Sequence, residues 1–203
     1  MINVSNEFLH EMENDNRNYL CYADITLSDG TVLNLDDTDI WQDGFSVEGS
    51  VSSDDVFSIG AANVGQFTLT LNNIEEKFSA YDFTDASVVA YTGLQLSEGI
   101  EKVRKGIYTV DEASYNGSLI TLTCLDNMTK LDVAYDPNLL GSAGFHVSFG
   151  TIVSKIAIRC GVTCGTIEDS SFELSSDQNL SEYTCRAILA YACQATGNFA
   201  YFD

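Results

Sequence analysis

The sequence has little proline, few basic residues and few histidines. Its 203 residues include 1 Pro, against about ten at average usage, so a proline-rich linker between domains is excluded. Lys and Arg number 9 against 30 Asp and Glu, which gives a formal net charge of -21. A charge of that sign makes duplex DNA and anionic membrane surfaces poor partners. We therefore expect no tight nucleic-acid binding.

Signal-like and membrane-spanning segments are also missing from the sequence. Residues 1–15 are polar and acidic, without the basic and then apolar pattern of a secretory signal. No stretch approaches the roughly 18 apolar residues that a membrane span needs. The sequence thus predicts a protein made in the cytoplasm, without membrane insertion. There the six cysteines are expected to be thiols.

The composition favours a folded chain with an uneven charge. Hydrophobic residues make up 45% and aromatic residues 11% of the sequence, which is typical of a protein with a core. Residues 1–100 contain 18 acidic residues, and their only bases are Arg17 and Lys77. The simplest interpretation of this acidic half is a solvated surface that favours solubility.

Alternation of apolar and polar residues predicts several strands. The predicted strands are residues 19–27, 31–35, 66–71, 107–115 and 118–125. Asp29-Gly30 and Asn116-Gly117 separate two pairs of these strands, and such dipeptides accept the positive φ that a type I′ hairpin turn requires at both positions. A short helix is predicted over residues 5–14, with Ser5 as its cap. The strands and turns predict an antiparallel barrel or sandwich.

The periodicity becomes helical after Asp136-Pro137. One helix is predicted from Phe149 to Cys160, with Ser148 as N-cap and Gly161 after its end. A second is predicted from Thr184 to Thr196, followed by Gly197 and by a β-prone run over residues 198–203. The buried arc of the second helix is predicted to hold Cys185, Ile188, Leu189, Ala192 and Ala195. The predicted fold class is α+β, mainly β, with an N-terminal arm (1–16), a β-barrel domain (17–136) and a small α/β domain (145–203).

The cysteines and histidines do not form a known catalytic or metal-binding pattern. Cys160, Cys164, Cys185 and Cys193 have the spacings C-x3-C and C-x7-C, which match no paired zinc knuckle. Core packing is the favoured interpretation of these thiols, and a metal or redox role is the alternative. His10 and His146 are the only histidines, and the sequence contains no hydrolase, P-loop or dinucleotide-binding motif. We expect no enzymatic activity, no cofactor and no metal.

Two clusters of charge have simple interpretations as well. The acidic run from Asp36 to Asp39 could hold calcium, but it lacks the glycine and the terminal glutamate of an EF-hand. Turn chemistry and solubility are favoured for it. Lys102, Arg104 and Lys105 form the one basic cluster, just before a predicted strand. It is expected to guard that strand against aggregation or to pair with acidic neighbours, and nucleic-acid contact is the less favoured alternative.

Several stretches of the sequence resemble a known family. They are Asp39-Ile40-Trp41, residues 51–71 (VSSDDVFSIGAANVGQFTLTL) with Asn72-Asn73, residues 105–132 (KGIYTVDEASYNGSLITLTCLDNMTKLD) and residues 184–203 (TCRAILAYACQATGNFAYFD). These resemble the baseplate hub, or tail-associated, proteins of phages and prophages of Firmicutes. The resemblance extends from about Tyr19 to the end of the chain and rests on short, degenerate motifs.

The resemblance implies a structural role in a virion tail. Proteins of this family are similar in fold to tail-tube subunits, and their two barrels per chain form a trimeric ring that links the tail tube to a spike or fibre around the DNA path. It implies other tail proteins as partners, and no catalytic residues are carried over. Because family members continue into a second barrel, a chain that ends at Asp203 is expected to be a fragment or a shortened product, monomeric or weakly associated by itself.

The sequence is compatible with two functions other than that of a tail component. One is a tail-tip enzyme that degrades the cell wall, and the other is an ordinary cytoplasmic binding module. If the chain lines a DNA conduit, part of its acidic surplus is expected to face the lumen, because an acidic wall does not bind phosphate. The candidate lumen-facing acids are Asp36, Asp37, Asp39, Asp43, Asp54 and Asp55.

Overall fold

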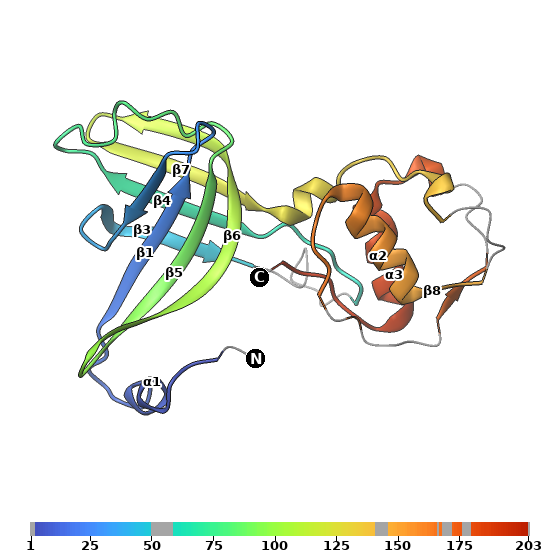
Figure 1. Ribbon diagram of the computed structural model, residues 1–203, viewed down its shortest axis with the longest axis horizontal. Coiled ribbons are helices and arrows are strands. Elements are labelled where there is room, and N and C mark those ends of the chain that lie inside the picture. Colours follow the sequence, from blue (N-terminus) through green and yellow to red (C-terminus); the bar gives the residue numbers. More distant parts are fainter. Residues whose placement is uncertain are drawn as a thin grey trace. The chain divides into compact units, whose positions relative to one another are not determined.

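The computed structural model of the chain describes residues 3–49, 59–140, 146–165, 167, 172–175 and 180–202 (Figure 1). The chain divides into two units. The β unit comprises residues 1–48 and 66–126, and the helical unit comprises residues 49–65 and 127–202. The helical unit therefore includes a segment that precedes β4, whereas the sequence suggested a continuous β domain over residues 17–136.

The described part of the β unit contains one antiparallel sheet of seven strands. They are β1 (Tyr19–Thr26), β2 (Val32–Leu35), β3 (Ile40–Glu48), β4 (Gln66–Asn72), β5 (Ser87–Leu96), β6 (Gly99–Asn116) and β7 (Leu119–Asp126). Their order in the sheet is β2-β1-β5-β6-β7-β4-β3. This confirms the predicted fold class, α+β and mainly β.

The sheet is strongly curved, but it is not the closed barrel that the sequence predicted (Figure 1). Over the described residues β2 and β3 are its two outermost strands, and no ladder joins them. β2 has four residues, all of which pair with β1, and β3 pairs with β4, so each outer strand has one paired neighbour among the described residues. The curvature nevertheless brings residues of both edges into one core, with Leu35 and Ile40 both buried in it.

The core of the β unit follows the predicted alternation of apolar and polar residues. In β4 and β7 the pairs Phe67–Cys124, Leu69–Leu122 and Leu71–Ile120 are directly opposite each other. All six of these side chains are fully buried. Burial of each large apolar side chain stabilises the fold by about 1.5–3 kcal/mol, so the central strands carry much of the stability.

Both predicted hairpins are present, but neither has the predicted turn. Asn116 pairs with Leu119, so the turn residues are Gly117 and Ser118, and only Gly117 has a positive φ, +59°. A two-residue loop with glycine in the first position is typical of a type II′ turn. At the other hairpin Gly30 N–H donates to the Leu27 carbonyl at 2.9 Å and only Gly30 has a positive φ, +87°. That is a three-residue loop rather than a type I′ turn.

Strands β3 and β5 were not named from the sequence, because irregularities interrupt their alternation. In β3 the register shifts between Ile40 and Phe45, where Asp43 has φ +60°. Gly44 in the same bulge lies so close to the Thr70 backbone that a Cβ would clash. The bulge in β3 removes the period of two that predicts a strand. In β5 Val88, Val89 and Ala90 are consecutive apolar residues and do not alternate, and the shift of register after Ala90 puts the extra residue, Lys105, in β6.

Helix α1 (Asn6–Glu11) is attached to the β unit through carboxylates. Ser5 caps the helix as predicted, because its Oγ accepts a hydrogen bond from Phe8 N–H at 3.0 Å. Glu7 accepts hydrogen bonds from the backbone and hydroxyl of Ser97, at 2.9 and 2.7 Å, in the loop between β5 and β6. Glu101 of β6 accepts the Ser5 N–H at 2.8 Å. All side chains of α1 stay at least partly exposed, so polar contacts position this arm.

The described part of the helical unit contains two helices, α2 (Phe149–Cys160) and α3 (Cys185–Thr196). Their predicted caps are confirmed. Ser148 and Thr184 accept backbone N–H groups of the first turns, and Gly161 and Gly197 end the helices with φ +66° and +73°. The described residues also include the short pair β8 (Val147–Ser148) and β9 (Glu173–Leu174), and the 3-10 turns η1 (Asn127–Leu131), η2 (Pro137–Leu140) and η3 (Leu180–Glu182).

Helix α3 buries the predicted residues with one difference. Cys185, Ile188, Leu189 and Ala192 are buried, but Ala195 is exposed and Cys193 is buried instead. The predicted β run after the helix is wrong, because residues 198–202 contain no strand. None of the helices among the described residues has the length and hydropathy to span a membrane.

Residues 59–65 pack against the end of α3, although they precede β4 in the chain. Ala62 is buried in the core of the helical unit, and the Ala61 carbonyl accepts the Ala200 N–H at 3.3 Å. Gly60 has φ +90°, and its backbone touches Gln194 so closely that any Cβ there would overlap it. Glycine is therefore required at this contact.

Candidate functional site

Three of the six candidate acids lie together in the tight turn between β2 and β3. Asp36, Asp37 and Asp39 belong to residues 36–39, the acidic turn, in which Asp39 N–H donates to the Asp36 carbonyl at 3.0 Å. Asp43 lies apart from them, exposed in the β3 bulge. Asp54 and Asp55 lie outside the described residues.

Each carboxylate of the acidic turn accepts a different hydrogen bond or ion pair. Asp36 accepts the backbone and hydroxyl of Thr38 at 2.9 and 2.6 Å, and these bonds lower the pKa of its carboxyl group. Asp37 accepts Cys21 N–H of β1 at 2.9 Å. Its charge adds to the effect of burial in raising the pKa of the Cys21 thiol. These two acids therefore shape the turn and attach it to the sheet.

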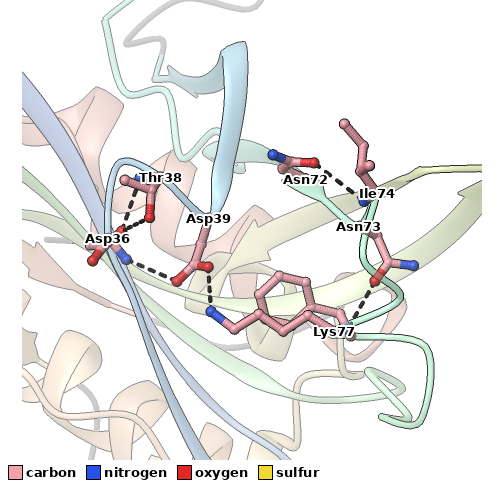
Figure 2. A network of polar contacts seen from close by, with 8 residues as sticks. Asp36, Thr38, Asp39, Asn72, Asn73, Ile74 and Lys77 are labelled. Atoms are coloured by element: carbon pink, nitrogen blue, oxygen red, sulfur yellow. Dashed lines mark hydrogen bonds and ion pairs between the residues drawn. The ribbon is translucent and has the colours of Figure 1, made fainter.

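Asp39 connects the acidic turn to the loop that follows β4 (Figure 2). Its carboxylate forms an ion pair with Lys77. The Asp39 side chain is 12% exposed and the Lys77 side chain 59%, so the carboxylate is shielded while the ammonium reaches solvent. Lys77 Nζ also lies 5.1 Å from the centre of the Phe78 ring. Asp39 is thus a compensated charge, unlike the exposed Asp36 and Asp37.

Asn73 fixes the loop after β4 through hydrogen bonds of its side chain. It is a buried polar residue, 5% exposed, and its Oδ1 accepts the Phe78 N–H at 2.8 Å. Its Nδ2 donates to Ser79 Oγ at 3.0 Å, and its backbone N–H donates to the Ser118 carbonyl at 2.7 Å. Sequence reasoning gave this residue no role. The available signal was the Asn72-Asn73 pair directly after an alternating strand, a position typical of asparagine turns.

The arrangement is that of a structural junction. The acidic turn, β1, the end of β4 and the following loop meet here, and every carboxylate of the turn has a protein partner. Among the described residues, no group of three or more His, Cys, Asp or Glu is placed to hold a metal ion. The structure therefore offers no support for calcium at the acidic turn.

The other candidate groups are dispersed over both units. His10 lies in α1, and His146 is an exposed residue 3.4 Å from the Glu173 carboxylate. Lys102 of the basic cluster lies over the Tyr22 ring, with Nζ 3.6 Å from the centroid, while Arg104 and Lys105 are exposed on β6. A cation over an aromatic ring is stabilised by the ring quadrupole. The structure therefore gives Lys102 an aromatic partner, whereas the sequence predicted that the cluster protects the strand against aggregation or pairs with an acidic neighbour.

Buried thiols account for three of the six cysteines. Burial raises the pKa of Cys124 and of Cys185 to about 12 and that of Cys193 to about 11. Cys21, Cys160 and Cys164 are only partly buried. A thiol with a raised pKa is a weak nucleophile at neutral pH, so the buried three behave as small apolar side chains.

Comparisons with solved structures find chains of a virion and of a phage tail among those to which this chain is similar. No family model and no curated protein matches the sequence. A chain of the virion of a native gene transfer agent particle has a TM-score of 0.46 and 11% identity over 71% of this chain and 57% of that one. The 43 kDa tail protein of prophage MuSo2 from Shewanella oneidensis has a TM-score of 0.43 and 14% identity over 88% of this chain and 53% of that one.

A third similar structure is a chain of the Francisella PdpA–VgrG complex. It has a TM-score of 0.34 and 10% identity, over 72% of this chain and 23% of that one. The chain described here spans about half the length of the gene transfer agent and MuSo2 chains.

Proposed function

We propose that the chain is a structural component of a phage or prophage tail, at the baseplate hub or tail tip, where it links the tail tube to a spike or fibre around the DNA path. The observation that carries the proposal is the fold class: one seven-stranded antiparallel sheet and a smaller helical unit, most of which follows β7 in the chain. The sequence motifs implied a mainly β, tail-tube-like unit followed by a small α/β unit, and the fold class agrees with this.

The location of the motifs adds support. The stretches around residues 66–73 and 105–126 form β4, β6 and β7, which are neighbours in the sheet. The ending L-D-N-M-T-K-L runs from the last residues of β7 into η1, where Met128 and Leu131 are buried in the core of the helical unit. The motifs therefore coincide with three adjacent strands of the sheet and with the point where the chain passes from β7 into the main part of the helical unit.

The proposal assigns other tail proteins as partners and the virion tail as the location. The chain by itself is expected to be monomeric or weakly associated, since the ring of the resembled family uses two barrels per chain. In the same proposal part of the acidic surplus faces a lumen. Asp36, Asp37 and Asp43 are exposed and fit such a role, whereas the Asp39 carboxylate is paired with Lys77.

The location can be tested on tails purified from the strain that encodes the chain. Immunogold labelling with an antibody against this chain is expected to mark one end of each tail. Deletion of the gene is expected to remove the label and to give tails without a complete tip. Normal, infective tails after the deletion would contradict the proposal.

A peptidoglycan zymogram separates the proposal from the enzymatic alternative. The purified chain is expected to leave the peptidoglycan intact, with lysozyme as the positive control. Clearing by this chain would identify a wall-degrading enzyme in place of a structural component.

A further inference from the structure

Two cysteines far apart in the sequence meet in the core of the helical unit. Cys160 is the last residue of α2 and Cys185 is the first residue of α3. The two helices pack against each other, and both side chains belong to the same apolar cluster. Their thiols are in hydrogen-bonding contact. Among the described cysteines, no other two thiols lie on different helices and are in contact with each other.

The two thiols differ in exposure, which gives them different chemical roles. Cys160 is partly exposed and lies at the end of its helix. Cys185 is fully buried, and burial raises the pKa of its thiol to about 12. Burial raises the pKa of Cys160 as well, but its hydrogen bond with Cys185 and the charge of Arg159 oppose the increase. Cys160 is therefore the thiol that a soluble oxidant meets first.

We propose that Cys160 and Cys185 are an oxidation site, at which hydrogen peroxide converts two thiols into one disulfide bond. In the first step the Cys160 thiolate attacks one peroxide oxygen and the O–O bond breaks, which gives Cys160 sulfenic acid and hydroxide. In the second step the Cys185 sulfur attacks the sulfenic sulfur, the S–O bond breaks, and the thiol proton leaves with the hydroxyl group as water. Two thiols are oxidised, one peroxide is reduced, and two waters form in total.

The bond would close a loop made of the whole connection between α2 and α3. Closing a loop of this length restricts the unfolded chain and stabilises the folded one. Oxidation is therefore expected to raise the melting temperature, by at least about 5 °C. This inference does not depend on the proposed tail function.

The sequence allows the bond to be mapped with two proteases. Trypsin cleaves after Arg159 and Arg186, and a glutamate-specific protease cleaves after Glu168 and Glu182. After peroxide treatment of the full chain and alkylation of free thiols, mass spectrometry is expected to find residues 160–168 (CGVTCGTIE) linked to residues 183–186 (YTCR). The intact mass is expected to fall by the mass of two hydrogens relative to a sample treated with a reductant.

Residues 160–168 also contain Cys164, so a matched pair of variants identifies the linked sulfur. Cys164→Ser is expected to keep the link and the increase in melting temperature, and Cys160→Ser is expected to lose both. The proposal is overturned if the two peptides stay unlinked in the wild type, or if Cys164→Ser removes the link. If Cys160→Ser fails to fold, the map of Cys164→Ser alone decides, because only Cys160 remains in its peptide.

Discussion

Asn73 shows how much of the β unit depends on a single buried amide. Its side chain binds Phe78 and Ser79 of its own loop, and its backbone N–H binds Ser118 in the turn between β6 and β7. Loss of a hydrogen-bond partner destabilises the fold more when the remaining polar group is buried than when it is exposed, because an exposed group can bind water instead. Asn73 therefore connects the loop after β4 to the turn between β6 and β7, in the junction beside the acidic turn.

We expect Asn73→Ala to reduce the free energy of unfolding by about 2 kcal/mol, because the buried Phe78 N–H loses its acceptor. Urea unfolding followed by circular dichroism measures this. Asn72→Ala is the matched control, since Asn72 Oδ1 accepts only the exposed Ile74 N–H at 3.3 Å. Equal losses for the two variants would show that burial of Asn73 does not matter.

Asp36 gives the acidic turn a dependence on pH. The hydrogen bonds from Thr38 lower its pKa in the folded state. Its contribution to stability is therefore complete above the unfolded pKa of about 4 and is lost as the pH falls through the lower folded value. Between about pH 5 and pH 3, Asp36→Asn is expected to lose less stability than the wild type, and parallel curves for the two proteins would refute this. Unfolding curves at each pH give the comparison.

Among the elements, regular patterns were predictable and interruptions were not. The strands over residues 66–71 and 118–125 and both long helices were predicted, because alternation and caps are local properties of the sequence. β3 was missed because its bulge depends on the backbone of a neighbouring strand, as Gly44 does on Thr70. β5 was missed because it begins with a run of apolar residues instead of an alternation. At the site, turn formation by Asp36 was predictable, but the partners of Asp37 and Asp39 come from β1 and a distant loop.

The turn between β6 and β7 yields a prediction at this scale. Gly117→Val is expected to cost at least about 1 kcal/mol in free energy of unfolding, because valine is strained at φ +59°. No atom lies near the added Cβ, so the loss would come from the backbone alone. Asn116→Ala tests the position of the turn. Asn116 does not have a positive φ, so its replacement is expected to cost little. A loss as large as that of Gly117→Val would indicate that the turn residues are Asn116 and Gly117 instead.

At the scale of the whole molecule, the net charge of -21 predicts weak interaction with DNA. Fluorescence anisotropy with a labelled duplex at low salt is the sensitive measurement, because screening is then weakest. We expect no binding at micromolar protein. If binding appears, its loss in a variant with Lys102, Arg104 and Lys105 changed to alanine would assign it to the basic cluster.

The helical unit is built from two separate parts of the chain, residues 49–65 and 127–202. A substitution at Gly60 tests the contact between these two parts. Gly60→Ala is expected to cost more than about 2 kcal/mol, because the Cβ would overlap Gln194 and the φ of +90° disfavours alanine. Thermal unfolding measures the loss. Gly150→Ala in α2 is the control, since the space beside it is open and alanine favours a helix. A tolerated Gly60→Ala would show that residues 59–65 do not pack on α3 in solution.

This discontinuity sets an order of events during translation. Residues 59–65 leave the ribosome more than a hundred residues before α3, which at bacterial speeds is a delay on the order of 10 s. β1, β2 and β3 are already made at that point, and β4 to β7 are synthesised during the delay, so the sheet can form first. Ala62 and its neighbours then lack the surface that buries them in the finished protein. Nascent chains that stall before α3 should therefore expose this segment to chaperones and proteases, and full-length chains should not.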